Sequence, residues 1–249
     1  MTEMFDYFVG YDKREVDAYH VCVKSAVRRS SAPLRVHALM EDHLRATGMF
    51  WRTHHRLGER AAKKRQPLNP SVKVDDQDAR PFSTEFAFTR FLVPELKRRS
   101  GWALFTDCDF MWLDDPMQIM VEADPRYAVM VVKHMHVPRE AVKMDGQSQQ
   151  AYRRKNWSSL CLWNCAHPAN RTLTLGDVND RPGSWLHAFE WLADDLIGGL
   201  DGRWNHLVGV DGQADPAHVG AAHFTLGGPW MVGYEQGQFA DLWRAERDA

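Results

Sequence analysis

The sequence predicts an α/β fold in which alternating strands and helices build a doubly wound sheet, and three observations lead to this prediction. A strand pattern at 5–11 is followed by a helical pattern and then by a second strand pattern at 34–40. A short apolar run at 102–106 is typical of a buried strand. This run stops at two aspartates, Asp107 and Asp109, which stand one residue apart. Because open α/β sheets bind ligands at the ends of their strands, these carboxylates mark a candidate site.

The chain of 249 residues is long enough to bury most of a central sheet, and we expect one domain over 1–249 with an insertion. A composition of 44% hydrophobic and 26% charged residues is that of a soluble globular protein. No stretch approaches the roughly 18 consecutive apolar residues of a membrane helix, and the acidic N-terminal segment does not resemble a secretory signal. We therefore expect a cytoplasmic protein without a transmembrane segment. The net charge of −2 provides no global attraction to nucleic acid or anionic lipid.

The four cysteines, Cys22, Cys108, Cys161 and Cys165, are sparse and lie in apolar contexts. This usage is typical of reduced thiols in a cytosolic protein. Cys161 and Cys165 lack the CxxC spacing of a zinc site, so we expect them to be structural. A reactive thiol at Cys108 stays open.

Local patterns predict the other elements. Asp12 and Glu15 have capping-box spacing, which predicts a helix directly after them. Its predicted buried face consists of Val16, Tyr19, Val23, Ala26 and Val27. Residues 45–80 have weaker periodicity and are expected to form an insertion or a mobile loop. Further helices are predicted at 83–92, limited by Pro94, at 116–122, where Pro116 follows Asp114 and Asp115, and at 185–192. Further strands are predicted at 127–133, 159–163 and 221–224.

Asp107 and Asp109 allow two interpretations. Neighbouring carboxylates repel each other and raise each other's pKa, so a bound divalent cation is the simplest agent that keeps both ionised. Alternatively, the two acids cap the next element in a turn. Late in the chain, His223 precedes a turn that contains Gly227 and Gly228. An imidazole completes metal sites begun by carboxylates, and glycine lets backbone amides approach a phosphate.

Four separated segments resemble the GT-A nucleotide-sugar glycosyltransferases, most closely glycosyltransferase family 8. They are the strand end at 9–12, the segment 88–94, the DxD segment at 105–109 and the late segment 223–230, in the family's order. The resemblance implies a GT-A, Rossmann-like domain with a central mixed, mainly parallel sheet flanked by helices. It also implies a metal-dependent, retaining transferase that moves a sugar from a nucleotide-sugar donor, expected to be a UDP-sugar.

The resemblance implies roles for individual residues. The donor-binding residues would be Tyr11, Asp12, Arg90, Asp107, Cys108, Asp109, Gly227 and Trp230. Tyr11 and Asp12 would hold the uracil base, and Arg90 would lie near the ribose, phosphates or sugar. The metal ligands would be Asp107, Asp109 and His223. Since carboxylates favour Mg²⁺ or Mn²⁺ and imidazole shifts the preference towards Mn²⁺, we expect Mn²⁺, with Mg²⁺ as a weaker substitute.

Two segments depart from the family pattern. The usual Asn-Ser-Gly appears as the sequence at 156–159, and the usual Lys-Pro-Trp ends here as Gly228-Pro229-Trp230. Lys155, in a basic and aromatic segment at 152–159, is the preferred replacement for the missing lysine. The alternative for this segment is a solvated basic turn.

Asp194 and Asp195 are similar to the family's Asp-Gln-Asp segment. The resemblance implies that one of them lies near the anomeric carbon and stabilises an oxocarbenium-like transition state, and our hypothesis is Asp194. A helix terminus with two solvated acids is the alternative.

Three observations leave the substrate open. His134 and His136 alternate, which suits a second metal, a substrate contact or a polar strand end. A basic stripe is predicted over 52–65, formed by Arg52, Arg56, Arg60, Lys63, Lys64 and Arg65. This stripe is either a solvated face or a contact for an anionic acceptor, such as a phosphorylated glycan, a lipid-linked sugar or nucleic acid. The oligomeric state is open.

Two other functions compete with the transferase. In a haloacid-dehalogenase-like phosphohydrolase, Asp107 would be the nucleophile, but Phe110 and Met111 stand where that class expects a Thr or Val. A catalytically silent sugar-binding protein on the same fold is the second alternative. Retention of the two aspartates and His223 argues against it.

Overall fold

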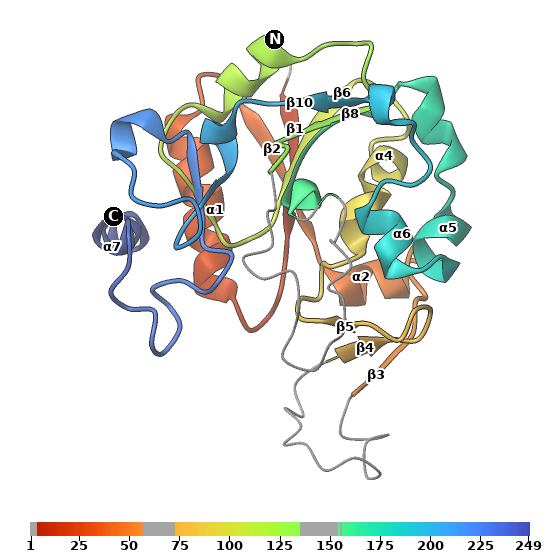
Figure 1. Cartoon of the computed structure of the whole chain (residues 1–249), viewed down its shortest axis with the longest axis horizontal. Helices are drawn as coiled ribbons and strands as arrows, with labels where there is room; N and C mark the ends of the chain where they lie inside the picture. The colour runs from red at the N-terminus through yellow and green to blue at the C-terminus, as the bar shows by residue number, and fades with distance from the viewer. Residues whose placement is uncertain (1–3, 57–72, 135–153, 155) are drawn as a thin grey trace, which may run out of the picture.

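The computed structural model describes residues 4–56, 73–134, 154 and 156–249, and its centre is a six-stranded sheet (Figure 1). The strand order across this sheet is β10-β8-β9-β6-β1-β2. The strands are β1 (Phe5–Gly10), β2 (Leu34–Leu39), β6 (Trp102–Thr106), β8 (Val129–Val131), β9 (Leu160–Asn164) and β10 (Ile197–Gly199). Strand β9 is antiparallel to β6 and β8, whereas the other three pairings are parallel. This is the mixed, mainly parallel sheet that the resemblance implied.

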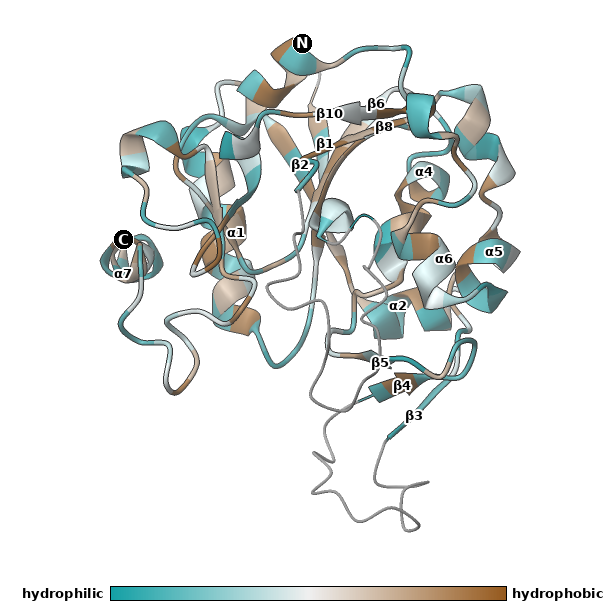
Figure 2. Cartoon of the chain, in the orientation of Figure 1, coloured by the Kyte–Doolittle hydropathy of each residue, from teal (hydrophilic) through white to brown (hydrophobic). Residues whose placement is uncertain are grey.

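Helices cover both faces of this sheet. Figure 1 shows α1 (Val16–Arg29) on one side, and α2 (Glu41–Ala46), α4 (Val93–Leu96), α5 (Leu175–Asp180) and α6 (Gly183–His187) on the other. The C-terminal helix α7 (Ala240–Asp248) packs against α1. Hydrophobic residues concentrate in the central strands (Figure 2), because those strands are covered on both faces. No helix in the described ranges has the length and apolar character needed to cross a membrane.

Short 3-10 helices connect these elements. They are η1 (Thr89–Leu92), η2 (Pro116–Glu122), η3 (Trp157–Ser159), η4 (Pro168–Thr172), η5 (Asp194–Leu196), η6 (Gly202–Asn205) and η7 (Pro216–His218). The carboxylate of Asp115 accepts a hydrogen bond from the Met117 amide (2.9 Å), and Pro116 lies in the first turn of η2. The predicted cap and first-turn proline are confirmed, although the helix is of the 3-10 type.

Two three-stranded sheets complete the fold. One has the order β11 (His206–Leu207), β12 (Ala221–His223), β7 (Phe110–Trp112). The other has the order β3 (His54–Arg56), β4 (Lys73–Asp75), β5 (Pro81–Phe82) and contains the described ends of the predicted insertion at 45–80. Residues 57–72 lie outside the described ranges.

The start of α1 differs from the prediction. Glu15 is itself the N-cap residue and makes no side-chain cap, so the capping box is wrong. The Asp12 carboxylate instead accepts hydrogen bonds from Arg14. The buried face is also rotated: Val27 is 52% exposed, and the buried residues are Ala18, Val21, Cys22, Ser25 and Ala26. The reason is that α1 packs between β7 and α7, neither of which the local pattern reveals.

Two predicted helices have other boundaries. The segment 83–92 forms turns and η1, and α4 begins only at Val93. Pro94 therefore lies in the first turn of a helix, where its missing N–H leaves no bond unmade, and does not end one. The helix predicted at 185–192 ends at His187, and Phe189 adopts a left-handed conformation (φ 50°) that interrupts a helix.

Candidate metal and donor-binding site

The DxD segment lies in the turn between two strands that belong to different sheets. Strand β6 ends at Thr106 in the central sheet, and β7 begins at Phe110 in the sheet with β12. The amide of Asp107 donates to the carbonyl of Ser159 (2.9 Å), which fixes the first aspartate beside β9. The chain therefore changes sheets within the DxD segment.

The pairing of β7 with β12 brings the histidine to this turn. The strands are antiparallel, with His223 opposite Phe110, and the two rings stack with centroids 4.4 Å apart. The Phe224 amide donates to the Asp109 carbonyl (2.9 Å), which extends the same ladder. Because His223 is opposite the residue after Asp109, its side chain reaches the carboxylates.

Asp107, Asp109 and His223 form a compact set of potential metal ligands. One ligand atom from each residue lies within 4.8 Å of the other two, and His223 Nε2 is 3.4 Å from Asp109 Oδ1. The side chains of the three residues are 14%, 18% and 3% exposed. Within the described part of the chain, Oδ1 of Asp107 and of Asp109 is buried without a well-aligned hydrogen bond. Two carboxylate oxygens and one imidazole nitrogen at these distances are a suitable ligand set for a divalent cation such as Mn²⁺ or Mg²⁺.

The tautomer of His223 follows from a chain of hydrogen bonds. Ser159 Oγ donates its single hydrogen to the Asn156 carbonyl (2.8 Å), so it accepts from Asn205 Nδ2 (2.9 Å). The Asn205 carbonyl oxygen therefore faces His223 Nδ1 at 2.8 Å and must accept a hydrogen from it. This leaves the lone pair of Nε2 directed to the carboxylates, as a metal-ligating imidazole requires.

The electrostatics of the site are dominated by buried carboxylates. Burial raises the pKa of Asp107 to about 7; the charge of Arg90 opposes this shift, and the charge of Asp109 adds to it. Burial and the charges of Asp109 and Asp12 raise the pKa of Glu15 to about 7. A bound cation would lower the pKa values of these carboxyl groups again, because its positive charge favours their ionised forms.

Glu15 was missed as a site residue because the sequence pattern assigned it only to a cap. The signal that could have found it is topological: β1 and β6 are parallel neighbours, so the chain after each strand emerges at the same edge. Glu15 Oε2 lies 3.9 Å from Cys108 Sγ. Burial and the charges of Asp109 and Glu15 raise the pKa of the Cys108 thiol, which keeps it protonated at neutral pH.

Arg90 contacts the first aspartate of the DxD segment and the segment before β9. Its Nη1 lies 2.8 Å from Asp107 Oδ1 and donates to the Ser158 carbonyl at 2.8 Å. The guanidinium also lies over the Phe105 ring, 5.2 Å from its centroid. Arg90 is 5% exposed, so this contact with Asp107 is part of the folded site. The predicted contact with the donor stays a prediction.

Tyr11 and Asp12 follow β1 at the same edge of the sheet. Asp12 is fully buried, and its carboxylate accepts from the Arg14 amide (2.9 Å), Arg14 Nη2 (2.6 Å) and the Glu85 amide (3.1 Å). Burial opposes the charge on Asp12, but these bonds lower its pKa overall. The Tyr11 ring packs edge-on against Tyr19 (5.2 Å).

Gly227 and Trp230 follow β12. Gly227 has φ +128°, a conformation that other residues rarely adopt. Trp230 packs against Phe224 and Trp243, with ring centroids 5.8 and 5.3 Å apart, and within the described ranges its buried Nε1 has no hydrogen-bond partner. The aromatic contacts anchor the ring beside the strand that carries His223.

The other predicted residues are on further segments of the chain or outside the described ranges. Asp194 and Asp195 are exposed on η5, and Arg154 makes an ion pair with Asp194. Lys155 and His136 lie outside the described residues. His134 follows β8; burial lowers its pKa, and the charges of Asp211 and His223 also act on it.

The predicted basic stripe over 52–65 is wrong in its described part. Arg52 is 2% exposed and forms an ion pair with Asp75 (2.5 Å), and Arg56 ends strand β3 and not a helical turn. Residues four positions apart share one face only in a helix, and Arg52 and Arg56 are not in a helix. The other members, Arg60, Lys63, Lys64 and Arg65, lie outside the described ranges.

The fold has clear counterparts among solved structures. The chain superposes on the bifunctional glycosyltransferase WbbM with a TM-score of 0.62 at 13% identity, covering 99% of this chain and half of that one. It superposes on the galactosyltransferase LgtC with a TM-score of 0.57 at 13% identity, covering 98% and 95% of the two chains. For mouse xyloside xylosyltransferase 1, the TM-score is 0.50 at 11% identity, with 89% and 97% covered. These likenesses confirm the GT-A glycosyltransferase fold.

The fold and the Asp-Asp-His cluster thus define a GT-A-fold protein with a candidate metal site. No model of a known protein family matches the sequence. The chain belongs to the family of Protein CDI from Arabidopsis thaliana, with which it is 41% identical over 247 residues, covering 98% of this chain and 86% of that protein.

Proposed function

We propose that this protein is a metal-dependent glycosyltransferase that transfers a sugar from a nucleotide-sugar donor, a UDP-sugar, with retention of configuration. The observation that carries the proposal is the convergence of Asp107, Asp109 and His223 at the carboxyl end of β6, where one buried oxygen of each carboxylate makes no hydrogen bond within the described residues. The GT-A fold supports it.

The residues of the site would act in defined ways. Asp107, Asp109 and His223 would hold Mn²⁺, or more weakly Mg²⁺, and the cation would neutralise the charge that grows on the diphosphate leaving group. Asn205 fixes the His223 tautomer through the 2.8 Å bond to Nδ1. Arg90 keeps Asp107 in place through its 2.8 Å ion pair.

Further residues would bind the donor and assist the transfer. The carboxyl end of β1, with Tyr11 and Asp12, would receive the uracil base, and the Gly227–Trp230 turn would cover the diphosphate. Asp194, or its neighbour Asp195, would stabilise the oxocarbenium-like transition state. The ammonium group of Lys155 would bind the donor phosphates in place of the family's late lysine.

The phosphohydrolase alternative is less well supported. The chain shares its fold with solved GT-A glycosyltransferases, and this fold does not favour a phosphohydrolase in which Asp107 is the nucleophile. The sugar-binding alternative predicts the same fold without turnover, so it is separated from the transferase by an activity measurement.

The test is release of UDP from a panel of UDP-sugars with Mn²⁺, in the presence and absence of the chelator EDTA. We expect slow, Mn²⁺-dependent release from one donor, reduced by roughly a hundredfold in Asp109→Asn. Asp241→Asn, at a 98% exposed position, is the matched control and should keep the activity. Equal release by both variants, or hydrolysis of p-nitrophenyl phosphate without a sugar donor, would contradict the proposal.

A further inference from the structure

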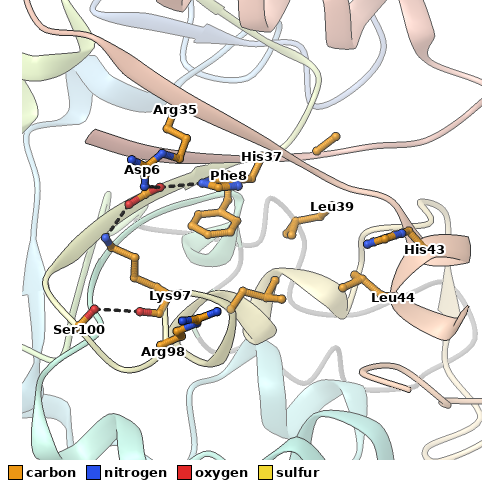
Figure 3. A pocket seen from close by; sticks show the side chains of 12 residues that line it. Asp6, Phe8, Arg35, His37, Leu39, His43, Leu44, Lys97, Arg98 and Ser100 are labelled. Atoms are coloured by element: carbon orange, nitrogen blue, oxygen red, sulfur yellow. Dashed lines mark hydrogen bonds and ion pairs between the residues drawn. The ribbon is translucent and has the colours of Figure 1, made fainter. Parts of the chain in front are cut away.

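The structure contains a cavity along strands β1 and β2 that the proposed function does not use. It has a volume of about 650 Å³ and lies between strands β1 and β2 and the segments that follow α4 and begin α2 (Figure 3). Its lining residues are Asp6, Phe8, Arg35, His37, Ala38, Leu39, His43, Leu44, Leu96, Lys97, Arg98 and Ser100. None of them belongs to the proposed donor site. Its size is that of a small-molecule pocket.

Positive charge dominates the polar side of this cavity. The one carboxylate in the lining, Asp6, is 4% exposed. Lys97 Nζ lies 2.5 Å from Asp6 Oδ2, and Arg35 Nη1 lies 3.4 Å from Asp6 Oδ1. Arg98 also lines the cavity. Since Lys and Arg are permanently charged at neutral pH, these three cations exceed the single carboxylate by two charges.

Arg98 is the cation that the fold itself leaves available. In the described part of the chain its side chain has no hydrogen bond or ion pair. It adopts a left-handed conformation (φ 54°), which is unfavourable for residues with a Cβ. The neighbouring Arg99 also has φ 54°, but its guanidinium is bonded to Glu95 and to the Leu173 carbonyl.

The other side of the cavity is apolar and partly planar. Leu39, Leu44 and Leu96 line it. The Phe8 ring stacks on the His37 imidazole with centroids 4.5 Å apart and an angle of 17° between the planes (Figure 3). His37 Nε2 is held by Asp6 at 2.7 Å, so the stacked pair is fixed in orientation. A flat or apolar group fits against this wall.

We propose that this cavity binds a small organic phosphate whose phosphate group lies among Arg35, Lys97 and Arg98. A phosphomonoester carries a charge of about −1.5 to −2 at pH 7, which matches the surplus of two positive charges. The attached organic group lies against the stacked Phe8 and His37 rings and the leucines. The cavity is independent of the proposed metal site, because no residue is shared between them.

Phenyl phosphate is a suitable probe because it joins a planar ring to a phosphate dianion. Isothermal titration with the chain of 249 residues should detect its binding at one site. Inorganic phosphate should bind more weakly, since it has no ring, and phenol should not bind, since it has no charge. Affinity for phenyl phosphate should fall as the salt concentration rises.

Variants separate this cavity from the surface and from the donor site. Arg98→Asn, a residue type that tolerates the left-handed conformation, should weaken binding at least tenfold, and so should Arg35→Gln. Arg126→Asn, at a 78% exposed position, is the control and should bind as the parent does. Asp109→Asn should also bind phenyl phosphate normally, even though it loses metal. Circular dichroism confirms that each variant is folded. The absence of binding to the parent at millimolar concentration, or equal affinities of the Arg98 and Arg126 variants, overturns the proposal.

Discussion

His223 Nε2 lies 3.4 Å from Asp109 Oδ1, although the two residues are 114 positions apart in the sequence. Their proximity depends on a short antiparallel ladder in which His223 is paired with Phe110. The ladder is reinforced by the bond from the Phe224 amide to the Asp109 carbonyl (2.9 Å). The metal-binding geometry is therefore built by backbone pairing.

The first prediction concerns the support of His223. Asn205→Ala removes the acceptor for Nδ1–H and leaves the imidazole free to rotate and to change tautomer. Loss of such an outer contact typically reduces metal affinity by about 10- to 100-fold. Mn²⁺ titration of the variant measures this change. Asn205→Asp keeps an acceptor and should restore most of the affinity; equal weakening in both variants would contradict the positioning role.

The second prediction separates the two acids on η5. Asp194→Asn should lower the turnover of the UDP-sugar donor strongly, and Asp195→Asn should have a smaller effect. Steady-state UDP release with KM and kcat measured separately is the readout, because a transition-state role lowers kcat. If Asp195→Asn abolishes turnover while Asp194→Asn does not, the assignment is reversed.

The third prediction concerns the buried ion pair of Arg52 with Asp75. Arg52 also donates to the carbonyls of Val178, within α5, and of Arg181, directly after it, so this pair ties the small β3-β4-β5 sheet to α5. Asp75→Ala leaves a buried guanidinium without its counter-ion and should lower the free energy of unfolding by about 3–5 kcal/mol. Urea unfolding measures the loss.

The control for this pair is the exposed pair of Arg126 with Asp124. Asp124→Ala should lower the free energy of unfolding far less than Asp75→Ala does, because solvent screens the charges of the exposed pair. A loss at Asp75 no larger than the loss at Asp124 would show that the buried pair does not hold the small sheet in place.

The fourth prediction is a pH dependence of stability that arises from His187. Burial, with the nearby charges of Arg90 and Arg52, lowers the pKa of His187 to about 3, whereas an unfolded histidine titrates near 6.5. Between these values the unfolded state binds the extra proton, so the free energy of unfolding falls as the pH falls. The loss from His187 should be on the order of 1–2 kcal/mol between about pH 6.5 and 5.

Urea unfolding at several pH values tests this dependence. His187→Gln should show a shallower fall than the parent chain, and His218→Gln, at an exposed position, should follow the parent. Parallel curves for all three proteins would mean that the imidazole of His187 is protonated as easily in the folded state as in the unfolded state.

Strong local signals made much of the architecture predictable. The apolar run at 102–106 matches β6 residue for residue, and Asp115 caps η2 as expected. Long strands with a buried pattern carry this information in their own sequence. The four segments that resemble glycosyltransferase family 8 identified Asp107, Asp109 and His223, and the side chains of these residues do come together.

Features that depend on tertiary pairing could not be predicted. Strands β7 and β12 have three residues each, which is too few for a periodic pattern. The pairing register that places His223 beside the aspartates therefore could not be predicted from the local sequence. Asn205 and Glu15 were missed because their roles come from neighbours distant in sequence. The burial of Arg52 was misjudged for the same reason, since its partner Asp75 is 23 residues further along the chain, on β4.

The central claim is that Asp107, Asp109 and His223 together hold a divalent cation next to a nucleoside diphosphate. Mn²⁺ titration followed by electron paramagnetic resonance, in the presence of UDP, tests it most directly because bound Mn²⁺ loses the signal of the free ion. The account predicts one bound Mn²⁺ per chain, lost in Asp109→Asn and kept in Asp241→Asn. Failure of the parent chain to bind Mn²⁺ with UDP, or unchanged binding by Asp109→Asn, would contradict it.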